Sequence, residues 1–150
     1  QYIVSNYMHR KVITASEDVT FKEAVEIMLR NETNGLVVVD NNNQVVGILS
    51  SWDIICYIVP DYLEEDKHLA SFEAGDVFFS RILEIKDHPI SKFMTRHVHV
   101  VHPSSNIIEA AALVSEHRIR QLPVVDEKGE LVGYLSRTNI KKAIGDALGL

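Results

Sequence analysis

The sequence has few of the features that mark secreted, membrane or nucleic-acid-binding proteins. It holds one cysteine, Cys56, so no internal disulfide can form, and a reducing, cytoplasmic setting is favoured over secretion. Cys56 lies in the apolar run IICYIV, where we expect a buried structural thiol. No apolar run approaches the roughly 18 residues of a membrane span, and we expect no signal peptide. The formal net charge of −6, without a Lys/Arg stripe, argues against a nucleic-acid partner.

The arrangements that carry catalysis or bind metals are also missing. There is no nucleophile–base set, no GxxxxGK[ST] loop and no strongly paired carboxylates. Ser50 and Ser136 follow predicted strands, but GILSS and GYLSR are not nucleophile elbows. His97, His99 and His102 lie close together without a Cys or acidic partner at suitable spacing, whereas zinc needs three or four ligands. We therefore predict neither an enzyme nor a metal site.

One stretch of the sequence occurs twice, 86 residues apart. LVVVDNNNQVVGILSSWDI (36–54) matches LPVVDEKGELVGYLSRTNI (122–140), and the match extends without a gap over 8–54 and 94–140. Each stretch indicates a strand, a polar turn, a second strand and the start of a helix. Fourteen of the 47 paired positions are identical, far more than chance agreement: Met8, Arg10, Val12, Glu23, Ala24, Leu36, Val38, Val39, Asp40, Val46, Gly47, Leu49, Ser50 and Ile54. We infer an internal duplication.

Each copy is predicted to be a β-α-β-β-α unit. A short extended piece (12–15; 98–101) precedes a helix. Thr20 stands three residues before Glu23, and Asn106 three before Glu109, as in helix N-caps with a reciprocal glutamate. Apolar residues follow at helical spacing: Phe21, Ala24, Val25 and Met28; Ile107, Ala110, Ala111 and Val114. Because so small a unit has little core, we expect an α/β (α+β) fold in which two pseudo-symmetric repeats pack through their sheets.

The predicted organisation is repeat 1 over 1–60, a connector over 61–87 and repeat 2 over 88–150. The closing helices are expected over 50–59 and 136–148. The connector has no counterpart after repeat 2, and a helix is expected from about Asp76 to Lys86, with Val77, Phe78, Ile82 and Ile85 broadly along one side. This helix either packs on the core or offers a surface to a partner subunit.

With both copies aligned, the chain resembles a tandem pair of CBS domains, the module named after cystathionine β-synthase and often called a Bateman module. The resemblance rests on the LVVVD and LPVVD strands, the VVGILSSWDI and LVGYLSRTNI segments, and an upstream Met before a short extended piece. It covers about residues 4–147. It implies two interlocked repeats with two clefts that can bind adenine nucleotides or related adenosyl ligands, a flat homodimer, and regulation of another domain or protein.

The resemblance implies one ligand site around Asp53. A carboxylate just past a strand end can accept hydrogen bonds from both ribose hydroxyls. Arg120 suits a phosphate because a guanidinium is always charged and binds two oxygens at once; Arg118 and His117 are close enough to assist. The positions carried over from the family are Ile48, Ser50, Asp53, His102 near the base, Ile119, Arg120 and Gln121. Two plainer roles stay open, since Asp53 suits a helix N-terminus and Arg120 an ordinary surface.

The second cleft departs from the family pattern. Its ribose position is Asn139, which lacks charge and accepts through one oxygen. The positions matching Arg120 and Gln121 are Asn34 and Gly35, which bring no cation. Ser16, Ser136 and Thr138 remain as polar candidates. We expect one competent site and one weak or empty site.

The sequence therefore predicts a cytoplasmic regulatory module that binds AMP, ADP, ATP or S-adenosylmethionine and controls a partner domain or protein outside this chain. A single arginine favours one or two phosphates over three. The alternative is a CBS pair that binds no ligand and serves as a dimerisation or interaction scaffold.

Overall fold

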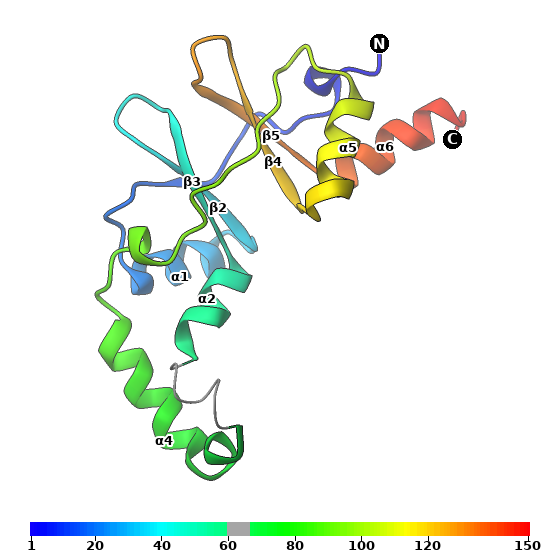
Figure 1. Ribbon diagram of the computed structural model, residues 1–150. Coiled ribbons are helices and arrows are strands. Elements are labelled where there is room, and N and C mark those ends of the chain that lie inside the picture. The colour runs from blue at the N-terminus through cyan, green and yellow to red at the C-terminus, as the bar shows by residue number, and fades with distance from the viewer. Residues whose placement is uncertain (60–66) are drawn as a thin grey trace.

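The chain forms two similar α/β lobes joined by crossing segments, and one long helix extends from the first lobe, away from the second (Figure 1). The computed structural model describes residues 1–59 and 67–150, with side chains for 1–59 and 76–150. Repeat 1 contains η1 (Val4–Asn6), β1 (Thr14–Ala15), α1 (Phe21–Arg30), β2 (Gly35–Val39), β3 (Val45–Ser50) and α2 (Ser51–Ile58). Then come α4 (Lys67–Ile85), η2 (Ile90–Lys92), α5 (Ile107–His117), β4 (Gln121–Val125), β5 (Leu131–Ser136) and α6 (Arg137–Ala147).

The two sheets repeat the same strand pairing. In repeat 1, β2 pairs parallel with β1 and antiparallel with β3. In repeat 2, β4 and β5 form the equivalent antiparallel pair, with the same register shift one residue before the end of the first strand. The predicted extended piece at 98–101 reaches its neighbour only through a parallel bridge between Val101 and Val124. The predicted mixed fold with two pseudo-symmetric repeats is confirmed.

The structure confirms one of the two predicted helix caps and adds two capping boxes that were not predicted. Thr20 and Glu23 form a capping box at α1, and Ser50 and Ser136 head matching boxes at α2 and α6. Asn106 is the N-cap residue of α5, but in the described part of the chain its side chain accepts no capping hydrogen bond. The prediction for Asn106 is thus right in position and wrong in mechanism. Its backbone carbonyl instead accepts the first hydrogen bonds of the helix, from the N–H groups of Glu109 and Ala110.

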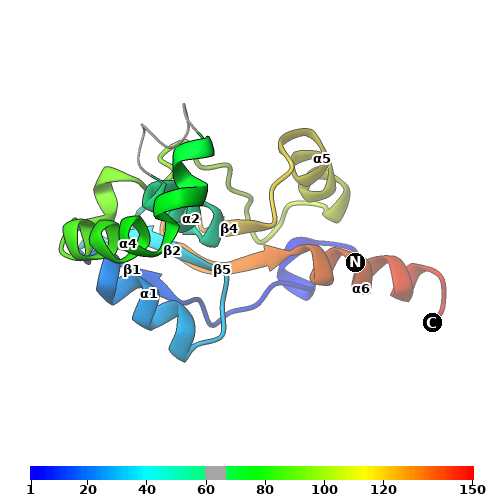
Figure 2. The same cartoon turned by 90° about the horizontal axis from the view of Figure 1, so that it is seen from below.

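Each repeat has its own hydrophobic core, and each core is completed by residues from the N-terminal segment of the other repeat. Val4, Tyr7 and Met8 pack into the core of repeat 2. Ile90, Phe93 and Met94 pack into the core of repeat 1. Figure 2 shows the N-terminal segment beside β5 and α6, away from the α1 helix of its own repeat. Neither core closes without the segment supplied by the other half.

The connector helix and the cysteine differ from expectation. α4 begins at Lys67, nine residues before the predicted start at Asp76, and runs through Gly75 and Asp76. Gly in a helix interior costs only about 1 kcal/mol relative to Ala, so it does not enforce a boundary. Cys56 is exposed, so the prediction of a buried thiol is wrong. None of the eight residues of α2 is fully buried, and its apolar run is therefore partly open to solvent.

Candidate functional site

Asp53 lies in the first turn of α2 and serves the helix N-terminus. Its Oδ2 atom accepts hydrogen bonds from the Ser50 backbone N–H (2.8 Å) and the Ser50 hydroxyl (3.0 Å). The plainer role weighed for Asp53, at a helix N-terminus, is thus present. The carboxylate is only half-buried, and both of its oxygens can accept further bonds once the hydroxyls that contact them reorient.

Thr95 is a site residue that the sequence reasoning missed. Its hydroxyl donates to Asp53 Oδ1 (3.1 Å), and its backbone exchanges two 2.9 Å hydrogen bonds with Ile48. The segment that enters repeat 2 therefore crosses the β3 strand of repeat 1 beside the Asp53 carboxylate. The duplication pairs Thr95 with His9, but the contact of His9 with Asn139, which is equivalent to Asp53, is visible only in the structure, so the sequence carried no signal for Thr95.

The equivalent position in repeat 2 is closed. Asn139 Oδ1 accepts from the Ser136 N–H (2.8 Å) and hydroxyl (2.9 Å), as Asp53 does from Ser50. Its Nδ2 atom lies 3.2 Å from His9 Nε2, and the His9 ring stacks on Tyr134 at 4.7 Å between centroids. Asn139 is only 7% exposed. Of the remaining candidates, Thr138 is exposed and the Ser16 hydroxyl donates to Asp18.

The two repeats meet at Gly35, the first residue of β2, and Gln121, the first residue of β4. A Cβ atom on Gly35 would lie 3.1 Å from Gln121 Oε1. Gly35 pairs with Ser50 in the sheet, and Gln121 follows Ile119 and Arg120 at the start of β4. Asn34 accepts from the Ser51 N–H (2.9 Å) and hydroxyl (3.3 Å) at the same edge. The structure therefore links Asp53, through Ser50 and Gly35, to the segment that carries Arg120.

His102 lies elsewhere. Its Nδ1 atom contacts the carbonyl of Val125 at 3.0 Å, at the hairpin end of β4. Arg120 precedes the other end of that strand, and five strand residues span roughly 16 Å. The structure does not bring His102 together with Arg120, because the connecting segment runs parallel to β4 and carries His102 past the site.

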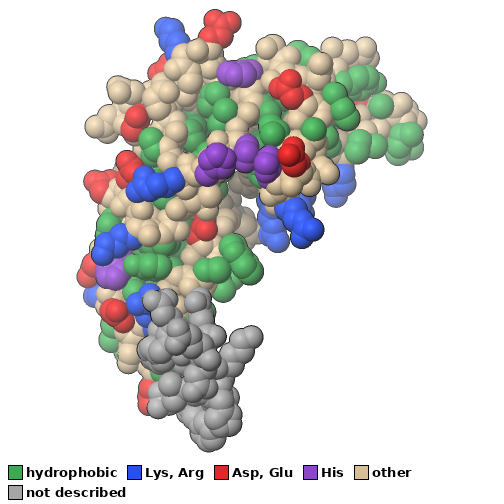
Figure 3. Space-filling model, viewed as in Figure 1, with side chains coloured by type: hydrophobic (Ala, Val, Ile, Leu, Met, Phe, Trp, Pro, Cys, Tyr) green, Lys and Arg blue, Asp and Glu red, His purple; other side chains and the backbone are tan. Residues whose placement is uncertain are grey.

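Three histidines form a row beside the connecting segment: His97 and His99 lie on the segment itself, and His117 lies at the end of α5 (Figure 3). The His97 and His99 rings meet edge to face at 5.1 Å, and His99 stacks on His117 at 3.9 Å. Burial lowers the pKa of His99 below its ordinary value, and positive charge on His117 and His97 lowers it further. In the described part of the chain, no three His, Cys, Asp or Glu side chains are placed to hold a metal ion. No described helix is long and apolar enough to cross a membrane.

Comparison with known proteins identifies the family. The model of the CBS domain matches the chain twice, over residues 4–60 and 90–146. The chain belongs to the CBS-domain family. The two matches coincide with the two structural repeats, so the predicted tandem CBS pair is confirmed.

Solved CBS pairs share the fold over nearly the whole chain. CBSX2 of Arabidopsis thaliana in complex with AMP superposes with a TM-score of 0.75 at 25% identity, covering 99% of both chains. The CBS domain pair of protein MJ0100, in complex with 5′-methylthioadenosine and S-adenosyl-L-methionine, gives 0.70 at 25% identity and 97% of both chains. These CBS pairs hold adenosyl compounds.

Curated relatives are longer than this chain. A homoserine O-acetyltransferase of Methanococcoides burtonii is 30% identical over 142 residues, which cover 95% of this chain and 24% of that protein. Chloroplastic CBSX2 is 27% identical, and the match covers 63% of its length. The chain thus spans about a quarter to two thirds of these relatives. CBS pairs are regulatory modules rather than catalysts, which confirms the prediction that this chain is not an enzyme.

Proposed function

We propose that this CBS pair binds an adenine nucleotide or related adenosyl ligand in the cleft around Asp53, with Arg120 on its phosphate, and controls a partner domain or protein. The observation that carries the proposal is the half-buried Asp53 carboxylate, held by Ser50 and Thr95 beside the Gly35–Gln121 contact between repeats. Ribose hydroxyls are donors of the kind that such a carboxylate binds. The adenosyl compounds in CBSX2 and MJ0100 support the ligand class.

The mechanism of control would be a change in how the two repeats pack. A ligand that touches Asp53 of repeat 1 and Arg120 at the start of β4 bridges the two halves. Such a ligand can shift the equilibrium between two arrangements of the repeats only if it binds one arrangement more tightly than the other. Thr95 joins the Asp53 carboxylate to the crossing segment, so displacing its hydroxyl would alter the contact between repeats.

We propose one working site per chain. Asn139 is buried and its amide is occupied by Ser136 and His9, whereas Asp53 is half-exposed and charged. We also propose that the chain acts as a homodimer in the cytoplasm. Exposed apolar side chains on α2 and α4 support the homodimer, and the single cysteine supports a reducing compartment.

The alternative function is a scaffold that dimerises without a ligand. The exposed apolar side chains of α2 and α4 favour it as much as they favour a ligand-binding dimer. A scaffold would not require a carboxylate at position 53. The capping box of Ser136 and Asn139 shows that an amide side chain caps a helix in the same way.

The test is a thermal-shift panel with AMP, ADP, ATP, S-adenosylmethionine and NADH on the wild-type chain and on Asp53→Asn. Because Asn139 already forms this capping box, the variant should fold normally. A true ligand at 100 times its Kd should stabilise the wild type by about 2.7 kcal/mol. Loss of the charge-assisted bonds should weaken binding by about tenfold or more.

Asp76→Asn, an exposed carboxylate on α4, is the matched control and should leave the shift unchanged. A stabilising ligand that acts equally on Asp53→Asn would place the site elsewhere. No shift with any compound, from a well-folded chain, would favour the scaffold.

A further inference from the structure

The two repeats differ in charge at positions that the duplication makes equivalent. The end of α5 and the first turns of α6 carry Arg118, Arg120, Arg137, Lys141 and Lys142. The equivalent residues of repeat 1 are Glu32, Asn34, Ser51, Ile55 and Cys56, none of them basic. The capping boxes of α2 and α6 and the β2–β3 and β4–β5 pairings are alike, so this difference in charge is not required by these elements.

The three arginines lie at one edge of repeat 2. Gln121 pairs with Ser136, so Arg120, which directly precedes Gln121, and Arg137, which directly follows Ser136, lie at the same end of the two strands. The Arg137 side chain donates from Nε to the Ile119 carbonyl (3.4 Å), which holds it against the segment between α5 and β4. Arg118 ends α5 in the left-handed conformation, at φ 53° and ψ 42°.

Nothing in the described chain neutralises this cluster. Arg118, Arg120 and Arg137 are exposed, and the ion pairs among residues 1–59 and 76–150 involve Arg30, Arg81, Arg96 and His117 instead. Lys141 follows Arg137 by one helical turn and adds a fourth cation on that side of α6. Such a concentration of positive charge contrasts with a net charge of −6 for the chain.

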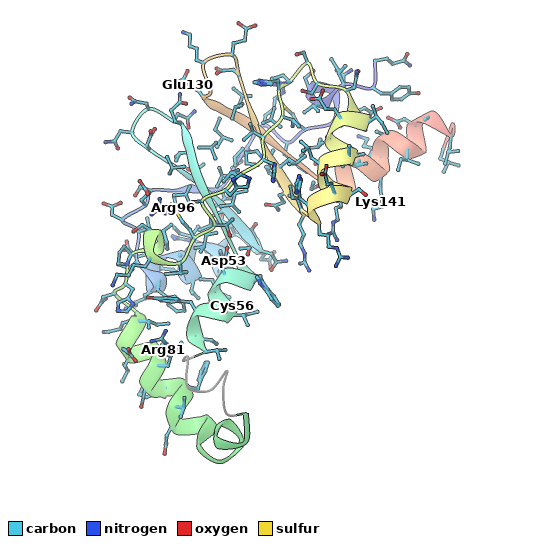
Figure 4. The ribbon with its side chains drawn as sticks, in the orientation of Figure 1. Asp53, Cys56, Arg81, Arg96, Glu130 and Lys141 are labelled. Carbon is cyan, nitrogen blue, oxygen red and sulfur yellow. The ribbon has the colours of Figure 1, made fainter. Side chains whose placement is uncertain are left out.

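The cluster adjoins the Asp53 site. Arg120 directly precedes Gln121, whose side chain contacts Gly35 at the edge beside Ser50 and Asp53. Figure 3 shows Lys and Arg side chains at the lower edge of repeat 2, beside the hollow between the lobes, and Figure 4 shows Asp53 and Lys141 on opposite sides of it. A ligand with its ribose at Asp53 would point an extended anionic tail towards the arginines.

We propose that the ligand of this site is an adenine nucleotide with two or more phosphates, ADP or ATP, selected over AMP and over the cationic S-adenosylmethionine by Arg118, Arg120 and Arg137. This rests on the proposed function. Each guanidinium can fork onto two phosphate oxygens, so three of them exceed what one phosphate needs. The sequence had indicated a single arginine and thus one or two phosphates; the strand register adds Arg137.

The experiment compares the affinities of adenosine, AMP, ADP, ATP and S-adenosylmethionine by titration calorimetry for the wild type, Arg137→Gln and Arg118→Gln. The wild type should bind ADP about tenfold more tightly than AMP, the value of one charge-assisted contact. Each variant should lose about tenfold for ADP and ATP while its affinity for adenosine stays the same. Arg30→Gln, an exposed arginine on α1, is the charge-matched control and should change nothing.

Equal wild-type affinities for AMP and ADP, or tighter binding of S-adenosylmethionine, would overturn the selection by phosphate number. Binding that is lost in Asp53→Asn but is unaffected by the arginine variants would uphold the proposed function and refute this inference. Absence of binding by all five compounds would refute both.

Discussion

At the scale of single residues, two glycines allow the crossing segments to approach the sheets. A Cβ on Gly133 would lie 2.5 Å from the His9 carbonyl oxygen and 3.1 Å from Met8 Sδ. A Cβ on its equivalent, Gly47, would lie 2.8 Å from Met94 Sδ and 3.0 Å from the Thr95 carbonyl oxygen. Both glycines are therefore required by the contact between halves.

We expect Gly133→Ala to destabilise the chain by about 1–3 kcal/mol, because the clash is with backbone and the crossing segment must shift. Urea unfolding of the two proteins measures the difference. Gly145→Ala is the matched control: among the described residues no atom beyond its own helix turn and chain neighbours lies within 4 Å of the new Cβ, and alanine in a helix should stabilise by about 0.5–1 kcal/mol. Equal stability of Gly133→Ala and the wild type would show that the crossing segment can move freely.

Residues that act within one local pattern could be predicted, and residues that act across the fold could not. The spacing of Thr20 and Glu23 predicts their capping box, and the duplication relates Asp53 to Asn139. Thr95 and Arg137 escaped prediction because they meet the site through strand register and chain crossing. Spacing alone also gives no direction along β4, so the contact of His102 with the Val125 carbonyl, at the opposite end of β4 from Arg120, could not be predicted.

At the scale of elements, α4 is attached to repeat 1 through the C-terminal end of α2. Arg81 donates to the Tyr57 carbonyl (2.8 Å) and lies over the Tyr57 ring at 5.2 Å. Tyr57 in turn stacks on Phe93, and its hydroxyl lies 2.6 Å from His88 Nδ1. The connector helix thus holds one end of the helix whose other end carries Asp53.

Arg81→Met should lower the free energy of unfolding by about 1–2 kcal/mol, because a mostly buried, charge-assisted hydrogen bond to a helix carbonyl is lost. The same variant should increase the rate of amide hydrogen exchange in α2 and α4 and leave the rate in α6 unchanged. Glu84→Gln removes only the exposed partner of the Arg81 ion pair, which is 64% exposed, and should change stability by less than about 0.5 kcal/mol. Unchanged exchange in α2 after Arg81→Met would mean that α4 does not restrain it.

The bounds of elements were predictable where a cap marks them. The closing helices were expected at 50–59 and 136–148, and with their caps they occupy those residues. The start of α4 was misjudged because Gly75 is a poor helix former and Asp76 suits an N-cap, although the helix runs through both residues. The missing strand at 98–101 reflects the tertiary route of the crossing segment, which pairs with β4 only at Val101.

At the scale of the whole molecule, apolar side chains remain exposed on α2 and α4, which contact each other. Trp52 and Ile55 are 71% and 53% exposed, and Phe78, Phe79 and Leu83 are 57%, 64% and 51% exposed. Large exposed apolar side chains that gather on neighbouring helices favour an interaction site. A second copy is the simplest occupant, because a twofold axis pairs such a surface with itself and closes the assembly.

We therefore expect the chain to sediment as a dimer of twice 16.9 kDa and Phe79→Glu to sediment as a monomer, because the charge would be desolvated at the contact. Leu29→Glu, at a side chain on α1 that is 75% exposed, should leave the dimer intact. Sedimentation velocity at several concentrations distinguishes the three proteins. A wild-type monomer at all concentrations would refute the homodimer. If Phe79→Glu is monomeric and still binds a nucleotide, the dimer is separate from the ligand site, as the position of Asp53 within one chain predicts.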